Sequence, residues 1–350
     1  MTTFSPDSGV HHSPSQREMV SVVIVNFNGE GMLRPCLESV FAQPYRPLDV
    51  IVVDNASTDG SAEMVRRDFP GVRLICNDVN RGFAEANNQG VALASADRIV
   101  LLNNDTVVEE NWLTGLLETA CHPGVGVVAS RVVTEGIPSA FYEMNGTVNY
   151  LGYNIMRTFR DLSMVFFAGG ASLTFAKHDV GLPFLPEYFL YHEDSFLSWR
   201  MRLRGFQVRM AQQSHVRHVG SATTRRQPSA FVTFYQERNR LLNALLFYEL
   251  RTLMLLFPFF AADALAKGMT ALFGKGKSLP GLLRAYSWIV AHPGWISTQR
   301  KALQQERKVD DREIMRWMSS KVLQGEDTLA STVNAISSAY ARIVGLAFYE

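Results

Sequence analysis

Runs made mostly of apolar residues recur over the first 132 residues of the chain. They lie at residues 20–26, 48–53, 72–76, 99–102 and 125–132. Short runs without polar alternation are typical of strands that are buried on both faces of a sheet. The sequence therefore predicts five buried strands in this part of the chain.

The segments between these runs carry apolar residues at intervals of three and four, which is the spacing of a helix with one buried side. The predicted helices cover residues 32–41, a stretch that ends at Arg67, a stretch that ends near Ala94, and residues 109–121. Ser57 or Thr58 is the expected N-cap of the second helix. Strands that alternate with such helices predict an α/β fold with a parallel sheet and right-handed crossovers.

Polar side chains stand where most of the predicted strands end. They are Asn26, Asp54, residues 77–80 and residues 103–105. Each group taken alone is also ordinary turn chemistry. Because the carboxyl ends of parallel strands meet at one edge of a sheet, where open α/β sheets bind their ligands, the groups together favour a nucleotide-type pocket.

The stretch at residues 98–108, RIVLLNNDTVV, is the centre of this pattern. Its buried strand stops on Asn103, Asn104 and Asp105, whose side chains cannot continue an apolar core. The Asp105 carboxylate could hold a hard divalent cation, and that cation could hold a diphosphate. The alternative is a turn followed by a helix cap.

A dinucleotide-binding unit is a competing interpretation of the first crossover. Gly29 and Gly31 follow a predicted strand and open a helix, and Asp54 ends the next strand. The third glycine of that fingerprint is replaced by Arg34, and Pro35 follows it. The fingerprint is therefore incomplete, and a nicotinamide enzyme is disfavoured.

The middle of the chain has a different pattern. Residues 141–167 mix aromatic residues with glycines and predict short antiparallel strands. Gly169 and Gly170 then allow either a close approach of the backbone to a ligand or a tight bend. Beyond a strand predicted at residues 206–210, His215 and His218 are expected in a loop beside the proposed metal site.

A helix is predicted within residues 185–205, with Gly205 as its stop. Glu193 and Asp194 lie at its start, where backbone N–H groups favour carboxylates. They either satisfy the helix dipole alone, or one of them is a general base held at the helix end.

Composition narrows the class of protein. The 350 residues carry a net charge of +1, so nothing global points to nucleic acid. The three cysteines, Cys36, Cys76 and Cys121, are odd in number and lack metal-ligand spacing, which predicts reduced core thiols and a cytoplasmic protein. Residues 1–18 are polar, without the apolar run of a signal peptide, and predict a disordered tail.

The last third of the chain is predicted to be helical. Residues 252–262 are uncharged, but Arg251, Pro258, Asp263 and Lys267 keep the apolar run shorter than a spanning helix needs. Dense apolar residues beside several lysines and arginines favour a helix at a membrane interface, with a core helix as the alternative. The remainder predicts polar amphipathic helices, with an oligomer contact as one role.

At this point seven segments resemble a known family. They are residues 20–28, 54–60, 80–88, 101–105, 168–172, 191–204 and 218–222. Their order and spacing are similar to those of family 2 glycosyltransferases, above all the rhamnosyltransferase-like branch of bacterial polysaccharide enzymes. The resemblance implies a GT-A catalytic domain over residues 19–240, with a mostly parallel, Rossmann-like sheet, and a helical extension over residues 241–350.

The resemblance also implies a nucleotide-sugar site at the carboxyl edge of the sheet. Asn26, Asn28 and Asp54 match positions that contact the base or ribose. Asn80, Gly82 and Asn104 match positions near the nucleotide. Asp105 matches the last acid of the metal-binding motif, and His218 matches the histidine that completes the metal shell, so the implied cofactor is Mg²⁺ or Mn²⁺.

The catalytic positions follow in the same way. Asp194 matches the general base, Glu193 matches a residue that supports the acceptor or the base, and Gly169 and Gly170 match a loop near the sugar and acceptor. The implied reaction is inverting transfer of rhamnose or a similar sugar from a dTDP- or UDP-sugar. The implied acceptor is a glycan or polyprenyl-linked saccharide hydroxyl, met at the inner face of the cell membrane.

Two departures and two alternatives accompany this resemblance. Asn103 replaces the first acid of the metal motif, and Phe196 stands where another acid often follows the Glu-Asp pair. A sugar nucleotidyltransferase is one alternative, but it would want a glycine-rich basic loop where residues 28–34 are a poor match. The other alternative is a non-catalytic scaffold that keeps the fold.

Overall fold

The structure is a computed structural model that describes residues 18–134, 146–155, 165–218, 228–274, 276–323 and 328–346. The tail expected at residues 1–18 lies outside this range except for Glu18. Residues 141–145 and 156–164 of the segment expected to form antiparallel strands lie outside it as well. The remainder of that segment does contain a short antiparallel pair.

The elements alternate as the sequence predicts for the first third of the chain. The strands are β1 (Val20–Asn26), β2 (Leu48–Asp54), β3 (Arg73–Cys76), β4 (Arg98–Asn103), β5 (Thr106–Val108), β6 (Val125–Thr134), β7 (Thr147–Val148), β8 (Asn154–Ile155), β9 (Ser172–Ala176) and β10 (Gln207–His218). The helices are α1 (Glu30–Phe41), α2 (Ser61–Asp68), α3 (Phe83–Leu93), α4 (Trp112–Ala120), α5 (Lys177–Val180), the 3₁₀ helix η2 (Pro186–Tyr188), α6 (Glu193–Leu203), α7 (Ser229–Phe247), α8 (Leu250–Leu272), α9 (Leu279–Ala291), α10 (Pro293–Gln305), α11 (Asp311–Met315) and α12 (Thr328–Ile343).

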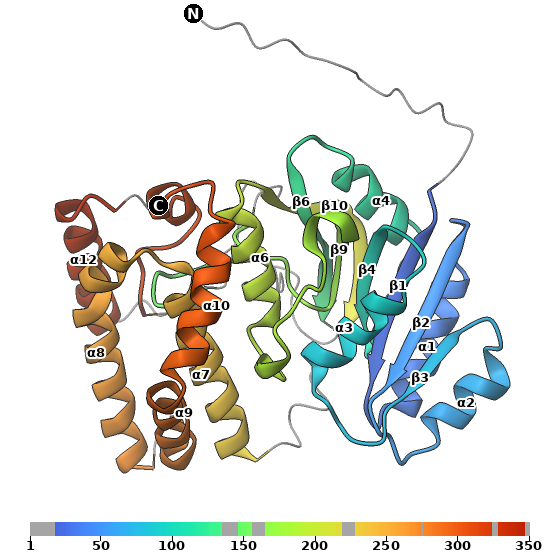
Figure 1. The fold of residues 1–350 in the computed structure, drawn as a ribbon, viewed down its shortest axis with the longest axis horizontal. Helices are drawn as coiled ribbons and strands as arrows, with labels where there is room; N and C mark the ends of the chain where they lie inside the picture. The colour runs from blue at the N-terminus through green and yellow to red at the C-terminus, as the bar shows by residue number, and fades with distance from the viewer. Residues whose placement is uncertain are drawn as a thin grey trace, which may run out of the picture.

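An eight-stranded sheet in the order β3-β2-β1-β4-β9-β6-β10-β5 forms the centre of the described part of the chain (Figure 1). Strands β3, β2, β1 and β4 are parallel, as predicted. Strand β9 lies antiparallel between β4 and β6, and β5 lies antiparallel to β10. The sheet is therefore mixed, because β9 enters it from a distant part of the chain for which the sequence pattern predicted no strand.

Both faces of the sheet are buried, which explains why the strands consist mostly of apolar residues. Along β1, Val20, Val22 and Ile24 pack into one apolar cluster together with α1, α2 and α4. Val23 and Val25 pack into the other cluster, which contains residues of α3, α6 and α7. A strand covered on both sides has no position for an exposed polar residue until it ends.

Local predictions fail at four points. The N-cap of α2 is Gly60 rather than Ser57 or Thr58, and no side chain caps that helix. Strand β10 continues to His218, so the two histidines lie on a strand and not in a loop. All three cysteines are free, but only Cys36 is a core thiol, because Cys76 and Cys121 are exposed. The fourth failure concerns the length of α8, described below.

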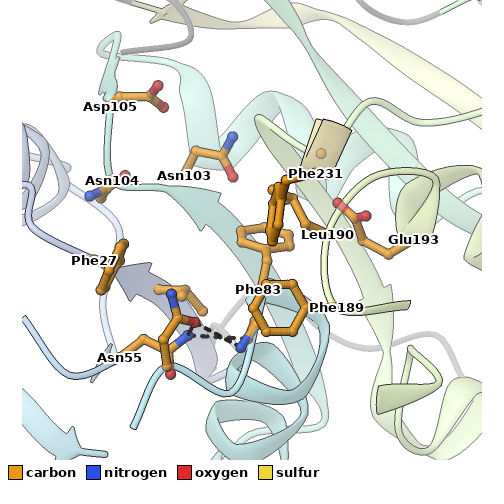
Figure 2. Close-up of a pocket in the computed structure, with 14 residues that line it drawn as sticks. Phe27, Asn55, Phe83, Asn103, Asn104, Asp105, Phe189, Leu190, Glu193 and Phe231 are labelled. Atoms are coloured by element: carbon orange, nitrogen blue, oxygen red, sulfur yellow. Dashed lines mark hydrogen bonds between the residues drawn. The ribbon is translucent and has the colours of Figure 1, made fainter. Parts of the chain in front are cut away.

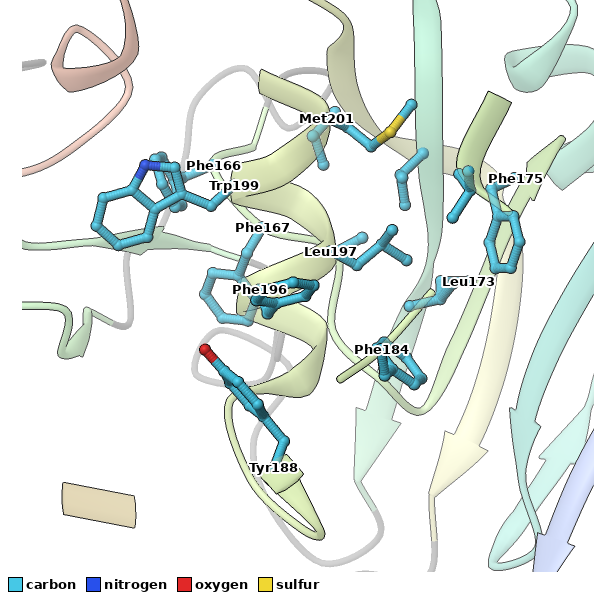
Figure 3. Packing of buried hydrophobic residues seen from close by; sticks show 14 of the residues in the cluster. Phe166, Phe167, Leu173, Phe175, Phe184, Tyr188, Phe196, Leu197, Trp199 and Met201 are labelled. Carbon is cyan, nitrogen blue, oxygen red and sulfur yellow. The ribbon is translucent and has the colours of Figure 1, made fainter. Parts of the chain in front are cut away.

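The C-terminal helices share a core with the sheet. Figure 3 shows the apolar cluster around α6, and the indole ring of Trp199 stacks on the ring of Phe247 at 5.3 Å, which joins α6 to α7. The same cluster continues through Leu256, Leu303 and Met315. The boundary expected at residue 240 therefore falls within α7.

Helix α8 corrects the prediction that the apolar run is too short to span a membrane. It has 23 residues and is long and apolar enough to do so, by length and composition alone. The helix continues through Pro258 and Lys267. The Lys267 amine is paired with Asp263 and Glu237 inside the protein. Its exposed apolar side chains recur at helical spacing along one face, at Leu250, Met254, Phe257, Leu265, Met269 and Leu272.

Candidate functional site

A pocket of about 360 Å³ opens at the carboxyl edge of the sheet (Figure 2). Its lining comes from β1, β4, the start of α3, the segment before α6 and the start of α7: Val25, Phe27, Asn55, Asn80, Gly82, Phe83, Asn103, Asn104, Asp105, Gly170, Phe189, Leu190, Glu193 and Phe231. The predicted crevice at the polar strand ends is therefore present, at the place where α/β sheets bind ligands.

Asn26 and Asp54 do not line this pocket. Both side chains are buried, and the Asn26 amide donates to Asp54 Oδ1 at 3.0 Å and to Ser57 Oγ at 3.1 Å. Asn104 donates to Asn26 Oδ1 at 2.7 Å. Asn26 therefore links Asp54 to Asn104, and the three side chains form one hydrogen-bonded group at the edge of the pocket.

Asn28 is also hydrogen-bonded to the loop that follows β2. Its backbone has a left-handed φ of 49°, and its Oδ1 accepts the Thr58 N–H at 2.8 Å. Its own N–H donates to Ser57 Oγ at 2.9 Å. Asn28 therefore lies beside the pocket, outside the set of residues that line it.

Asn55 is a lining residue that the sequence reasoning passed over. Its amide donates to Asn80 Oδ1 at 2.8 Å, and its Oδ1 accepts the Arg81 N–H at 3.0 Å. Asn80 Oδ1 in turn accepts the Gly82 N–H at 2.9 Å. Asn55, Asn80 and Gly82 are thus brought together in one wall, and the position of Asn55 directly after Asp54 was the available signal.

Gly82 is needed at this wall for a steric reason. Its φ of 85° is left-handed, and a Cβ there would lie 2.4 Å from the ring of Phe189 and 2.8 Å from the carbonyl oxygen of Phe189. The Phe189 ring therefore lies directly against the backbone at the start of α3. Figure 2 shows Phe27 on one side of the pocket and Phe83, Phe189 and Phe231 on the other, so aromatic rings form both walls.

Asp105 and His218 meet as predicted. His218 Nε2 lies 3.2 Å from Asp105 Oδ2, and both side chains are largely buried. The other Asp105 oxygen, Oδ1, and Asn103 Oδ1 are buried and accept no hydrogen bond from the part of the chain that the structure describes. Unsatisfied buried acceptors are costly, and they fit a cation or a donor group of a ligand.

The donor set suits a hard divalent cation. Two ligands of one octahedral ion at about 2.1 Å lie roughly 3 Å apart, close to the separation of the Asp105 and His218 atoms. Within the described residues, no group of three or more His, Cys, Asp or Glu side chains could hold a metal. Phosphate oxygens of a substrate or water would have to supply the other ligands.

Glu193 and Asp194 open α6, as predicted, but their environments differ. Glu193 lines the pocket, and its buried Oε2 has no hydrogen-bond partner among the described residues. Asp194 lies behind it, with Oδ1 accepting the Ser195 N–H at 2.6 Å and Oδ2 accepting the Gly170 N–H at 3.2 Å. Gly170 thus joins the lining of the pocket to Asp194, while Gly169 precedes it in the same loop.

These environments affect the pKa values of the two carboxyl groups differently. Burial, reinforced by the neighbouring Asp194 charge, raises the pKa of Glu193 past neutrality. Burial also raises the pKa of Asp194, but the N–H groups of Ser195 and Gly170 stabilise its charged form and oppose that rise. The two N–H groups therefore favour Asp194 as the ionised member of this adjacent pair, and burial favours the protonated form of Glu193.

The segment that leads to Glu193 is strained. Phe189, Tyr191 and His192 have φ values of 58°, 69° and 63°, which side chains other than glycine rarely adopt. Such residues cost of order 1–3 kcal/mol each and persist where the surrounding structure imposes them. Burial lowers the pKa of His192 to about 3, so this imidazole is neutral.

Arg238 and Arg240 on α7 are buried. Arg240 pairs with Glu237 at 2.6 Å and Asp263 at 3.0 Å. The Arg238 guanidinium donates to backbone carbonyls of the segment before α6. Both guanidinium groups are therefore engaged by other parts of the protein.

The comparisons with known proteins agree with this geometry. Residues 21–179 match the model of glycosyl transferase family 2. A glycosyltransferase, GlyG, from Streptococcus pneumoniae is 30% identical over 114 residues, which are 32% of this chain and 38% of that protein. The glucosyl-dolichyl phosphate glucuronosyltransferase of Haloferax volcanii is 30% identical over 143 residues, covering 36% of this chain and 44% of its own length.

The chain thus spans less than half the length of these two relatives. Among solved structures, GalNAc-T7 with UDP, GalNAc and Mn²⁺ superimposes with a TM-score of 0.57 at 14% identity, over 80% of this chain and 59% of the other. At that identity the likeness concerns the fold alone. Together with the sequence match, it leads to one conclusion: residues 21–179 are similar to glycosyl transferase family 2, and the chain has the GT-A fold.

Proposed function

We propose that the protein transfers a sugar from a nucleoside-diphosphate sugar to a hydroxyl of a glycan or lipid-linked saccharide in cell-surface polysaccharide synthesis. One observation carries this proposal. A single pocket contains the Asp105 carboxylate on one side and the Glu193 carboxyl on the other, with aromatic walls between them (Figure 2). Such a pocket can hold a charged diphosphate at one end and an attacking hydroxyl at the other.

The donor is proposed to be a dTDP- or UDP-sugar, with rhamnose or a similar sugar as the transferred group. The aromatic rings of Phe27 and Phe189 offer apolar surfaces for a base or a sugar face. Asn55 and Asn80 supply amide groups at the same wall. The bound UDP of GalNAc-T7 supports a nucleotide in this class of pocket.

Mg²⁺ or Mn²⁺ is the proposed cofactor, held by Asp105 and His218. When bound, such an ion supplies Lewis-acid stabilisation of the charge that develops on the leaving diphosphate. The unpartnered oxygens of Asp105 and Asn103 support this assignment. The Mn²⁺ in the GalNAc-T7 structure supports it as well, without separating Mn²⁺ from Mg²⁺.

Asp194 is the proposed general base of a single displacement that inverts the anomeric carbon. A base must be ionised, and the backbone N–H groups of Ser195 and Gly170 favour the ionised form of Asp194. Glu193 faces the pocket with its proton retained, so it can donate a hydrogen bond to the acceptor or the sugar. Holding both substrates in line at this site supplies further acceleration.

Helix α8 supports a location at the inner face of the membrane, where a polyprenyl-linked acceptor would be met. Its exposed apolar face lies in a strongly basic part of the chain. Residues 250–305 contain seven lysines and arginines and a single acid, Asp263, which is paired with Arg240 and Lys267. Apolar area and positive charge together favour an anionic lipid surface. A second copy of the chain is the other occupant that a test must exclude.

The testing experiment is calorimetric binding of UDP, dTDP and GDP, with and without Mn²⁺ or Mg²⁺, to the wild type and to Asp105→Ala. We expect metal-dependent binding of one nucleotide that the variant loses. That result fixes the donor class for a transfer assay. Binding of none of the three would leave the scaffold alternative as the better interpretation.

A further inference from the structure

The segment at residues 188–192 connects the two functional ends of the pocket. The carbonyl oxygen of Phe189 accepts the Ala84 N–H at 3.2 Å, and its ring lies against Gly82, so the segment touches the wall where the nucleotide is proposed to bind. Leu190 lines the pocket, and Glu193 follows directly. Whatever fixes this segment fixes the nucleotide wall and the carboxyl pair together.

The segment does not hold this shape by itself. Leu190 N–H donates to the Tyr188 carbonyl at 2.6 Å, which closes a three-residue turn around Phe189. Phe189 has φ 58° and ψ −59°, close to the geometry of the rare and strained form of that turn. With Tyr191 and His192 also left-handed, contacts from outside the segment must maintain it.

Asn239 on α7 provides three of these contacts. This side chain is fully buried, and its Nδ2 lies 2.8 Å from the carbonyl oxygen of Tyr188, 2.9 Å from that of Leu190 and 2.8 Å from that of Tyr191. An amide has two hydrogens, so at least one of them is shared between two carbonyls. The Asn239 amide therefore donates to three carbonyl groups of the strained segment.

The neighbours of Asn239 fix the orientation of its amide. Its Oδ1 accepts from Arg238 Nε at 3.0 Å and from Arg238 Nη2 at 2.8 Å, so its NH₂ group must face the carbonyls. One turn further along α7, Asn243 Oδ1 accepts the Tyr188 hydroxyl at 2.5 Å, and its amide lies 3.4 Å from the His192 carbonyl. Arg238, Asn239 and Asn243 thus hold the segment from its first residue to its last.

We propose that Asn239 is a positioning residue for sugar transfer, which acts through residues 188–192 to place Glu193 and Asp194 against the bound donor. The reaction in this statement rests on the proposed function. Asn239 itself does not line the pocket, so its effect reaches the substrate only through the segment that it binds.

The test is Asn239→Asp, which keeps the acceptor for Arg238 but turns an oxygen toward three carbonyl oxygens. We expect amide hydrogens within residues 184–196 to exchange at least tenfold faster with solvent, while protection in β1, β2 and β4 is unchanged. Because a misplacement of about 1 Å can cost roughly 100-fold in rate, kcat should fall about 100-fold. The calorimetric Kd for the nucleotide should change less, by about tenfold or below.

Asn334→Asp is the matched control. Asn334 on α12 also fixes a loop through its amide, accepting from Val322 N–H at 2.8 Å and donating to the Leu323 carbonyl at 3.0 Å, but that loop is not the segment at residues 188–192. It should alter neither kcat nor exchange at residues 184–196. Asn243→Ser is a milder second variant at the same segment, and it should raise exchange there in the same direction.

Unchanged exchange at residues 184–196 in a folded Asn239 or Asn243 variant would overturn the proposal. So would a kcat within threefold of the wild type when exchange has risen. A wild type that transfers sugar from none of the donors refutes the proposed function instead. The exchange measurement still tests whether Asn239 holds residues 188–192, so the two failures can be told apart.

Discussion

The two carboxyls at the start of α6 lead to the sharpest prediction. Asp194→Asn and Glu193→Gln are isosteric changes at adjacent positions, yet we expect losses of activity that differ greatly in size. A positioned general base contributes about 10²–10⁴-fold, so Asp194→Asn should reduce kcat by that amount while nucleotide binding is kept. Glu193 is protonated at neutral pH, and glutamine is also neutral and a hydrogen-bond donor, so Glu193→Gln should cost less than about tenfold.

The pH dependence separates the two roles further. Transfer should rise with pH as Asp194 ionises, above the usual range of an aspartate because burial raises its pKa. It should fall again on the alkaline side, as Glu193 loses the proton that its raised pKa retains through neutrality. Glu193→Gln should abolish the alkaline limb alone, because glutamine has no proton to lose.

Thermal unfolding gives an independent measurement. A carboxyl whose pKa is raised in the folded protein binds more protons there than in the unfolded chain, so its contribution to stability is lost as pH rises through the folded-state pKa. The Tm of the wild type should therefore fall relative to that of Glu193→Gln as the pH rises from about 4.5, the ordinary glutamate pKa, to about 8, the pKa of the buried Glu193, and should then level off. Initial rates from pH 5 to 9.5 and calorimetric scans over the same range complete the assay. Loss of activity in Glu193→Gln as large as in Asp194→Asn, or an alkaline limb that persists in Glu193→Gln, would refute the assignment of roles.

Three further predictions concern the metal site, the nucleotide wall and α8. Asp105→Ala should weaken nucleotide binding at least tenfold with Mn²⁺ or Mg²⁺ present and leave metal-free binding within twofold; equal losses in both titrations would exclude a metal ligand. Gly82→Ala should reduce the free energy of unfolding by about 2–5 kcal/mol, from a left-handed φ and a Cβ 2.4 Å from an aromatic ring, and should weaken nucleotide binding. Gly181→Ala, with φ 68° and open space around its Cβ, should lose only the backbone part, about 1–2 kcal/mol, as measured by urea unfolding. Phe257→Glu with Leu265→Glu should abolish co-sedimentation with anionic phosphatidylglycerol vesicles, whereas an unchanged vesicle pellet would argue against the surface, and a concentration-dependent dimer in light scattering would assign it to a second copy.

Much of the sheet could be predicted because each strand's burial is visible in its own few residues. A strand covered on both faces needs mostly apolar residues, and each of β1, β2 and β4 has at least four in a row before it ends on Asn26, Asp54 or Asn103. The place of Glu193 and Asp194 at a helix start is local in the same sense.

Other features depend on residues that are far apart in the chain. Strand β9 lies in the sheet between β4 and β6, and the pattern of apolar residues along the chain does not predict this position. The left-handed backbone of Phe189, Tyr191 and His192 contradicts the preference of each residue, and contacts with α7, about fifty positions later, impose it. A local pattern cannot predict a conformation that only distant partners make stable.

The division is clearest at the polar strand ends. The sequence alone determined that Asn26 and Asp54 lie at the edge where the pocket forms, because apolar runs end there. Only the tertiary structure decided that they face each other, since the parallel register of β1 and β2 places Asn26 directly beside Asp54. Strands less than 5 Å apart let short polar side chains bond sideways, and the pocket is then lined by the residues one step beyond, Phe27 and Asn55.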